Sequence, residues 1–149
     1  MDQTPLTPDF REFLSLLNEY DVRYLLVGGY AVGFHGYVRY TKDLDVWVAI
    51  GPDNAAKTAK VIEIFAGTKM DPSKVLSTRT LLQIGAPPTR IEVLTEVDGV
   101  DFDACFEQRF TKVVDGLPIN VISLTDLRKN KRASNRPQDL ADLDNLPME

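Results

Sequence analysis

Two aspartates, Asp43 and Asp45, stand two residues apart at the start of an apolar run from Val46 to Ile50. Alternate residues of a strand point to the same face, so this run predicts a strand that carries both carboxylates side by side. Neighbouring carboxylates repel each other, and a bound cation is the usual reason to tolerate them. Mg²⁺ suits such a pair because it takes a few carboxylates and completes its shell with water and phosphate oxygens.

The residues before this pair could supply a phosphate site. Tyr24 to Val27 predicts a short buried strand, and Gly28 and Gly29 allow a sharp turn into a helix expected over Tyr30 to Phe34. Bare N–H groups at a helix start bind anions. A phosphate cradle and a carboxylate pair on adjacent strands together predict a nucleotide site. Taken alone, the glycines also fit a plain tight turn, and the aspartates a solvated acidic one.

The pattern of two glycines, a short helix and an Asp-x-Asp strand resembles the polymerase-β-type nucleotidyltransferase superfamily. A narrower resemblance is to small bacterial nucleotidyltransferase-like proteins, which are related to type IV abortive-infection toxins and to the minimal nucleotidyltransferases of toxin–antitoxin pairs. The residues that carry it here are Gly28, Gly29, Ala31, His35, Gly36, Arg39, Thr41, Asp43 and Asp45. The resemblance implies an NTP substrate, Mg²⁺ (with Mn²⁺ as the alternative) and a partner chain of the toxin–antitoxin kind.

The same resemblance implies roles for three carboxylates. Asp43 and Asp45 would hold two metal ions, one activating the attacking hydroxyl and one neutralising the triphosphate. Glu92, on a strand expected over Arg90 to Thr95, takes the place of the superfamily's usual third Asp and is one methylene longer. It is therefore either a third metal ligand or the partner of Arg90 or Arg39 in a surface ion pair.

Further residues are implied as phosphate ligands. Gly28 and Gly29 would offer backbone N–H donors. The superfamily often has a Ser at the second position, and with Gly29 there a side-chain hydroxyl is missing. Arg39, with Thr41 beside the acidic pair, would clamp a phosphate or balance Asp43 or Asp45. His35, the single histidine, is expected to be a structural hydrogen-bonder rather than a base.

A second group lies near the end of the chain. The string KRASNRPQDLADLDNL resembles the C-terminal part of the same group of proteins. The resemblance implies that Lys131 and Arg136 reach the triphosphate or the acceptor, and that Asp139 orients one of them. A carboxylate at the position of Asp139 is also favoured by the dipole of the helix that follows, whatever its function.

Patterning predicts one α+β domain over residues 1–149, a mixed sheet flanked by helices with a helical C-terminal segment over about 123–146. The resemblance implies that this domain has the nucleotidyltransferase fold. A first helix is expected from Pro8, capped by Thr7. The remaining elements are expected as a helix over Asn54 to Phe65, a loop or short helix over Lys69 to Thr78, a strand over Thr80 to Ile84, a helix over Asp101 to Arg109, a hairpin over Lys112 to Ile122, and two final helices, the last with an apolar stripe of Leu140, Leu143 and Leu146.

Bulk properties exclude several classes. The 149 residues carry a net charge of −5, which disfavours a general nucleic-acid coat but not the docking of one RNA end. A basic cluster exists for such docking: Arg128, Lys129, Lys131, Arg132 and Arg136. No apolar run is long enough to cross a membrane. The single cysteine, Cys105, excludes an internal disulfide and fits a reducing cytoplasm.

The sequence thus predicts a nucleotidyltransferase that moves a nucleoside monophosphate from an NTP to an acceptor hydroxyl, either the 3′ end of a transfer RNA or a protein side chain. The alternative is a catalytically weakened module that binds nucleotide or a partner protein, motivated by the Glu at position 92. A third hypothesis is a toxin–antitoxin component whose role depends on a second chain.

Overall fold

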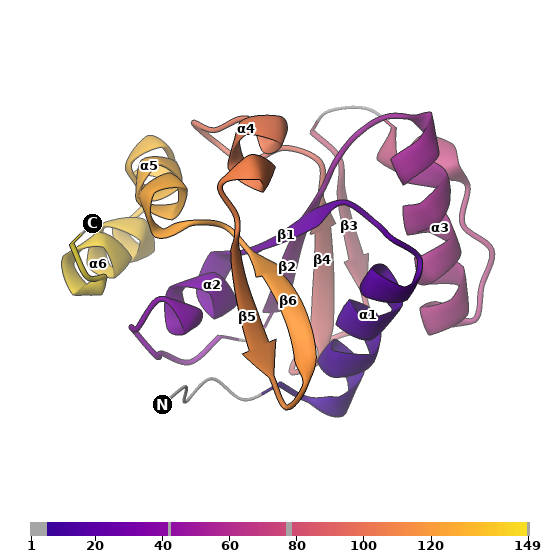
Figure 1. The fold of residues 1–149 in the computed structure, drawn as a ribbon, viewed down its shortest axis with the longest axis horizontal. Coiled ribbons are helices and arrows are strands. Elements are labelled where there is room, and N and C mark those ends of the chain that lie inside the picture. The colour runs from indigo at the N-terminus through magenta and orange to yellow at the C-terminus, as the bar shows by residue number, and fades with distance from the viewer. Residues whose placement is uncertain (1–5, 42, 77–78, 149) are drawn as a thin grey trace.

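Two neighbouring strands, β1 (Tyr24–Val27) and β2 (Asp43–Val48), form the centre of the sheet. The computed structural model describes residues 6–41, 43–76 and 79–148, which form a six-stranded sheet in the order β3-β4-β2-β1-β6-β5 (Figure 1). The outer strands are β3 (Leu81–Ile84), β4 (Arg90–Leu94), β5 (Phe110–Val114) and β6 (Leu117–Val121). β2 runs parallel to β4 and β1 parallel to β6, while the other neighbours are antiparallel, so the sheet is mixed as expected.

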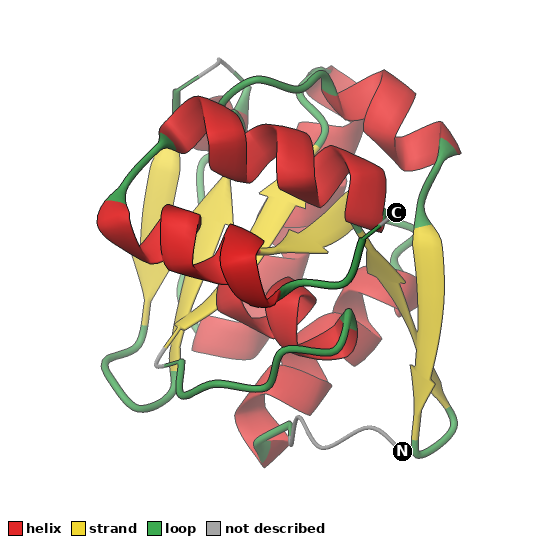
Figure 2. Cartoon of the chain, turned by 90° about the vertical axis from the view of Figure 1, so that its left-hand side faces the viewer, coloured by secondary structure: helices red, strands yellow, loops and turns green. Residues whose placement is uncertain are grey.

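Helices cover both faces of this sheet (Figures 1 and 2). On one face lie α1 (Pro8–Glu19) and α3 (Pro52–Ala66), and on the other α5 (Leu124–Ser134) and α6 (Pro137–Asn145), which run side by side in front of the strands in Figure 2. The shorter elements are α2 (Gly28–Phe34), the 3₁₀ turn η1 (Pro72–Val75) and α4 (Phe102–Glu107). The chain therefore forms the α+β architecture that the sequence predicts.

Strand alternation explains why one sheet face is core and the other carries the acidic residues. Leu44 and Val46 of β2, and Ile91 and Val93 of β4, are fully buried against the α1–α3 side. The intervening residues point to the α5–α6 side, which is where Asp43, Asp45 and Glu92 lie. The core thus fixes the register that brings the carboxylates together.

Local signals set several element ends as predicted. The Thr7 hydroxyl accepts from the Phe10 N–H at the start of α1, and Ser123 accepts from the Asp126 N–H at the start of α5. The helix after the two glycines begins at Gly28 rather than at Tyr30. Within Lys69 to Thr78 the structure forms η1, and residues 77–78 lie outside the described ranges.

The apolar stripe predicted for the last helix is wrong at Leu140 and confirmed at Leu146. Leu140 is 47% exposed, whereas Asp139 and Asp142 of the same helix are 1% and 0% exposed. Of the three leucines, Leu146 alone is fully inside, at 5% exposure. The acidic side of α6 faces the interior because basic side chains lie there and form ion pairs with it.

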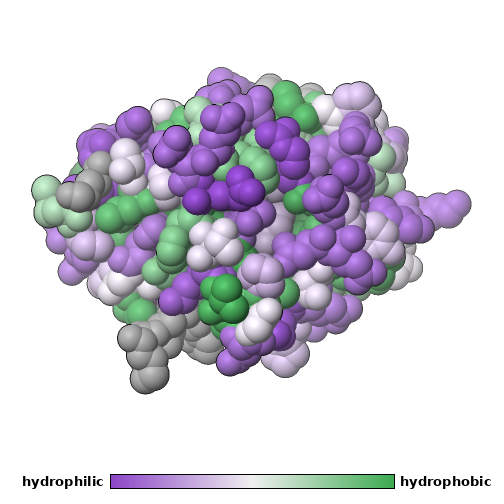
Figure 3. All heavy atoms as spheres, in the orientation of Figure 1, coloured by the Kyte–Doolittle hydropathy of each residue, from purple (hydrophilic) through white to green (hydrophobic). Residues whose placement is uncertain are grey.

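The molecular surface is otherwise ordinary. Hydrophilic side chains dominate the face drawn in Figure 3, and apolar ones are scattered among them in small groups. Within the described ranges, every helix falls short of the length and apolar character that a membrane span requires.

Candidate functional site

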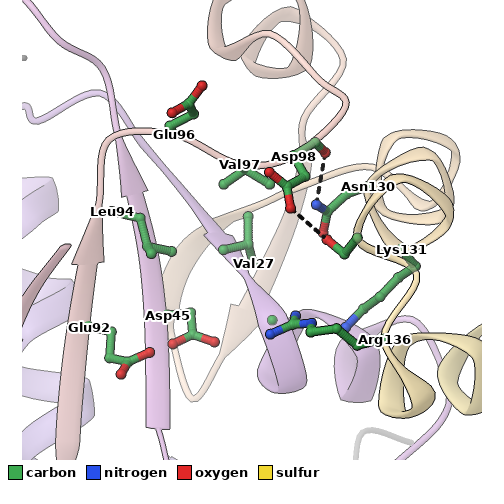
Figure 4. A pocket seen from close by; sticks show the side chains of 12 residues that line it. Val27, Asp45, Glu92, Leu94, Glu96, Val97, Asp98, Asn130, Lys131 and Arg136 are labelled. Atoms are coloured by element: carbon green, nitrogen blue, oxygen red, sulfur yellow. Dashed lines mark hydrogen bonds between the residues drawn. The ribbon is translucent and has the colours of Figure 1, made fainter. Parts of the chain in front are cut away.

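A cavity of about 280 Å³ opens between the strand face and α5. We call it the carboxylate cavity, and Figure 4 shows Asp45 and Glu92 on one wall with Lys131 and Arg136 opposite. The register pairs Asp45 of β2 with Glu92 of β4, which places the two carboxylates on neighbouring strands at the same level. The cavity is lined by Val27, Gly28, Asp45, Glu92, Leu94, Glu96, Val97, Asp98, Asn130, Lys131, Ser134 and Arg136.

Asp45 is the electrostatically strained member of this site. Its Oδ1 atom is buried and has no hydrogen-bond partner among the described residues. Burial, then hydrogen bonding with Glu92 and the negative charges of Glu92 and Asp43, raise the pKa of Asp45 to about 8, while Lys131 opposes the rise. A carboxyl in such surroundings demands a proton or a cation.

Asp43 is placed differently, although it shares the strand face with Asp45. Arg90 of β4 donates to it through two parallel hydrogen bonds, Nε to Oδ1 and Nη2 to Oδ2, each 3.0 Å long. The same guanidinium is 3.9 Å from the Glu92 carboxylate, which instead accepts from Gln83 Nε2 at 2.9 Å. Arg90 therefore pairs mainly with Asp43, and the ion pair between Arg90 and Glu92 that the sequence suggested is the weaker of the two contacts.

These residues can be tested for their fit to a divalent cation. Within the described ranges, no three His, Cys, Asp or Glu side chains stand close enough to form a ready-made metal site. The unpartnered Oδ1 of Asp45 and the adjacent Glu92 nevertheless provide an all-oxygen donor pair of the kind Mg²⁺ prefers, with phosphate oxygens or water left to complete the shell. The donor chemistry of Asp45 and Glu92 therefore fits Mg²⁺, while both oxygens of Asp43 are bound to Arg90.

Gly28 and Gly29 allow the backbone to approach the side chains of Asp45 and Thr41 closely. A Cβ on Gly28 would overlap the Asp45 carboxylate, and one on Gly29 would lie 2.6 Å from Thr41 Oγ1. Gly28 also has a φ of +70°, which an L side chain rarely adopts. No side chain caps the start of α2, so the N–H groups predicted to be bare lack side-chain partners. Thr41 itself supports β2, donating to the Asp43 carbonyl at 3.3 Å.

Three basic residues, two of them from the C-terminal segment, form ion pairs with two buried aspartates of α6. Lys131, 4% exposed, places Nζ 3.2 Å from Asp139 Oδ1 and 2.9 Å from Asp142 Oδ2. Arg136 donates to Asp139 through Nε at 2.8 Å. Arg39 reaches across from the loop after α2 and donates to both oxygens of Asp142, at 2.8 and 2.9 Å. We call these five residues the charge network.

This network decides the roles that the sequence left open. Asp139 contacts both Lys131 and Arg136, so it orients two cations rather than one. Arg39 balances Asp142 instead of Asp43 or Asp45 and does not line the carboxylate cavity. Because Lys131 is buried among acidic groups, the five basic residues of the segment do not form one surface patch.

The pKa values of the two aspartates in the charge network are shifted in the opposite direction to that of Asp45. Burial by itself raises the pKa of Asp139 and of Asp142, but hydrogen bonds from Arg136, Arg39 and Lys131 outweigh it and hold both values below the ordinary one. These two carboxylates are therefore stably ionised. His35 is structural as predicted, because its Nε2 donates to the Ile122 carbonyl at 2.7 Å and burial lowers its pKa.

The sequence did not identify several of the residues that line the carboxylate cavity. Asp98, Asn130 and Ser134 line the wall opposite the strands, where Asn130 donates to the Asp98 carbonyl at 2.9 Å and the Ser134 hydroxyl lies 3.3 Å from Asp98 Oδ2 (Figure 4). Asp142 was missed too, although its spacing of three from Asp139 puts both on one helix face. That spacing, considered together with Lys131 and Arg136, could have indicated that Asp142 belongs to the same ionic cluster.

Comparison with known proteins supports the fold. No family model and no curated protein matches the sequence. Among solved structures, TM1012 of Thermotoga maritima, provisionally named a nucleotidyltransferase, superposes with a TM-score of 0.60 at 14% identity, over 90% of this chain and 87% of that one. An antigenic nucleotidyltransferase-like protein of Paracoccidioides brasiliensis gives 0.54 at 16% identity, over 94% and 76%.

A third similar structure is ANT(2″)-Ia in complex with adenylyl-2″-tobramycin, with a TM-score of 0.53 at 15% identity, covering 89% of this chain and 82% of that one. The similarity to all three extends over most of both chains. The nucleotidyltransferase fold predicted from the glycine pair and the Asp-x-Asp strand is confirmed.

Proposed function

We propose that this chain is a nucleotidyltransferase that moves a nucleoside monophosphate from an NTP to an acceptor hydroxyl. The observation that carries the proposal is Asp45, whose Oδ1 atom is buried and unpartnered among the described residues, beside Glu92 and within a nucleotidyltransferase fold. A pKa raised to about 8 means that this position favours a bound positive charge, and a metal cation would meet the same need as a proton.

Each part of the carboxylate cavity has a task in this proposal. Asp45 and Glu92, joined by Asp43, would hold Mg²⁺. The bound ions, two of them by the superfamily's mechanism, would supply charge neutralisation and an activated acceptor oxygen. Lys131 and Arg136 would face the triphosphate from the opposite wall, and the Gly28 backbone would approach it closely because no side chain intervenes. Asp139 and Asp142 would keep the Lys131 ammonium in place.

The acceptor is proposed as an RNA 3′ end, such as that of a transfer RNA, or a protein side chain. Transfer would form a bond from the acceptor oxygen to the α-phosphorus and release pyrophosphate. Catalysis would come from positioning and from neutralising charge, as is usual for phosphoryl chemistry. A role within a toxin–antitoxin pair, with a second chain as partner, is part of the same proposal.

The test is isothermal calorimetry of NTP binding with and without Mg²⁺. We expect metal-dependent binding by the natural chain and its loss in Asp45→Asn, which keeps the volume of the side chain and removes the charge. Asp144→Asn is the matched control, because Asp144 is an exposed aspartate of α6 outside the charge network. Absence of NTP binding by the natural chain at any Mg²⁺ or Mn²⁺ concentration would contradict the proposal.

One observation favours the alternative of a catalytically weakened binding module. The Arg90 guanidinium occupies both oxygens of Asp43, where a cation would otherwise bind. Substituting Arg90→Gln separates the two readings. If the module reading holds, this variant gains metal affinity and transfer activity that the natural chain lacks, and Glu92→Asp gains activity as well. If the natural chain is already active, both substitutions reduce it.

A further inference from the structure

A second cavity, of about 330 Å³, lies beyond the carboxylate cavity on the same side of the sheet. The two share Glu96 and Val97, which Figure 4 shows past Leu94, away from Asp45. Its volume is within the range of pockets that take small ligands. It is lined by Arg23, Trp47, Ala49, Ile50, Thr95, Glu96, Val97, Val100, Asp101, Phe102 and Asp103.

The lining of the second cavity differs in kind from that of the first. Six of its residues are apolar or aromatic, and the charged ones are three carboxylates and one cation. The cation, Arg23, is already engaged, pairing with Asp103 at 3.0 Å and lying over the ring of Phe102 at 5.4 Å. Such a lining repels phosphate and accepts a flat, neutral group whose edge carries hydrogen-bond donors for the carboxylates.

Trp47 adds a second observation. It is 2% exposed, packs edge-on against Phe102 at 5.1 Å, and its indole N–H has no hydrogen-bond partner among the described residues. Indole is a donor only, and a buried donor without an acceptor is costly. The Nε1 atom is enclosed, so a ligand acceptor would offset that cost after a small shift of the cavity wall at Trp47.

The second cavity lies close to the carboxylates along β2. Trp47 follows Asp45 by two residues on the same strand face, and two residues of a strand span about 7 Å. A group held beside Trp47 is therefore about one sugar ring away from the carboxylates. The phosphates would remain at Lys131 and Arg136, and the apolar part of the same or a second molecule would extend into the second cavity.

We propose that the second cavity binds a nucleobase with an exocyclic amino group, as in adenine or cytosine. Its ring lies on the apolar floor, its amino group donates to the carboxylates of Glu96 or Asp101, and a ring acceptor faces the Trp47 side. The base belongs either to the donor NTP or to the terminal nucleoside of the acceptor. This assignment of source rests on the proposed function, whereas the binding of the base does not.

The experiment uses the single tryptophan of the chain as its reporter. Its indole N–H gives one resonance in a ¹⁵N-correlated spectrum, to be followed during titration with adenosine and, separately, uridine, without phosphate or metal. We expect a saturable shift with adenosine and at least about tenfold weaker binding of uridine, which has no exocyclic amino group. Equilibrium dialysis with labelled adenosine measures the same affinity independently of the resonance.

Matched variants locate the binding. Ile50→Glu places a charge at the mouth of the second cavity, where Ile50 is 47% exposed, and should weaken adenosine binding about tenfold. Ile64→Glu makes the same change on α3, at a residue that is 42% exposed and lines neither cavity, and should leave binding unchanged. No adenosine binding by dialysis, equal affinity for uridine, or equal loss in both variants would overturn the proposal.

Two features of these experiments keep this proposal separate from the proposed function. The adenosine titration contains neither phosphate nor metal, so a failure of metal-dependent NTP binding leaves the adenosine result intact, and the reverse also holds. Competition between adenosine and a Mg²⁺–NTP complex at the indole resonance would assign the second cavity to the base of the donor. Simultaneous binding of the two would assign it to the acceptor.

Discussion

Asp45 on β2, which is half-buried, and Asp142 on α6, which is fully buried, lie on the same side of the sheet, yet their surroundings are opposite. Asp142 accepts hydrogen bonds from Arg39, Lys131 and Gln138, and its pKa lies below the ordinary value. Asp45 has an oxygen with no partner among the described residues, and its pKa is raised to about 8. The more deeply buried aspartate is therefore the one with the lower pKa, so the neighbours of each carboxylate and not burial alone decide its pKa.

The difference separates a carboxylate whose charge is compensated within the fold from one whose charge is not, and in the proposed function the second one binds a cation. Removing Asp142 would take the carboxylate from Arg39 and leave Lys131 with Asp139 alone, whereas removing the charge of Asp45 would relieve repulsion from Glu92 and Asp43. Stability and binding should thus respond in opposite ways to substitution at the two aspartates.

The largest effect is expected for Asp142→Ala. This variant leaves Lys131 and Arg39 without a shared carboxylate in a buried site, which typically costs about 3–5 kcal/mol of unfolding free energy. Urea unfolding followed by circular dichroism measures the loss. Asp144→Ala, at an exposed position of the same helix, should stay within about 0.5 kcal/mol of the natural chain. A cost below about 1 kcal/mol for Asp142→Ala would show that the charge network is not structural.

The second prediction concerns the pH dependence caused by Asp45. Its folded pKa is raised above the unfolded value of 3.8, so the folded state holds a proton that the unfolded state releases. That stabilisation is complete below pH 3.8 and is lost as the pH rises to about 8, with a slope of at most about 1.4 kcal/mol per pH unit. In EDTA, Asp45→Asn should lack this decline between pH 5 and about 8. Identical pH profiles for the two proteins would place the Asp45 carboxylate in a hydrated, unperturbed setting.

The third prediction tests the partner of Asp45. Glu92→Gln removes one of the negative charges that raise the pKa of Asp45 and keeps a side chain able to contact Gln83. The pKa of Asp45, followed by ¹³C chemical shift of its carboxyl carbon, should move down toward the ordinary carboxyl value. It should stay somewhat raised, because burial is the larger cause. An unchanged titration would mean that Glu92 does not interact with Asp45.

The smallest effect is expected for Leu140→Ser. The hydrophobic pattern of the last helix would put Leu140 inside, but it is 47% exposed, so its loss should change stability by no more than about 0.5 kcal/mol. Leu146→Ala, at a 5% exposed leucine just after the same helix, should cost about 2 kcal/mol or more. Equal costs in thermal or urea unfolding would mean that the face of α6 has been assigned wrongly.

Much of the fold could be predicted because its signals are local. The strand period places Asp43, Asp45 and Glu92 on one face, and the caps at Thr7 and Ser123 lie where the sequence indicates them. A glycine pair at the end of a strand also predicts a tight turn with few alternative conformations. For these elements, residues close in sequence determine the structure, so a single chain contains enough information.

The charge pairings could not be predicted in the same way. Arg39 and Asp142 are 103 residues apart, and Arg90 and Asp43 are 47 apart. A basic residue near several acidic ones offers many pairings of similar local merit, and the tertiary packing of α5 and α6 decides among them. The hydrophobic pattern failed at Leu140 for this reason, because a buried ionic network outweighed the apolar stripe.

The charge network also determines how the protein should come apart under acid. Arg39 joins the loop after α2 to α6 through Asp142, and Lys131 joins α5 to α6 through Asp139 and Asp142. Protonating these carboxylates, which requires a pH below their ordinary pKa, would cut those connections while leaving the apolar core between the sheet and α1–α3 intact. The two C-terminal helices would then open as a subglobal unit, with amide exchange accelerated there before the central strands.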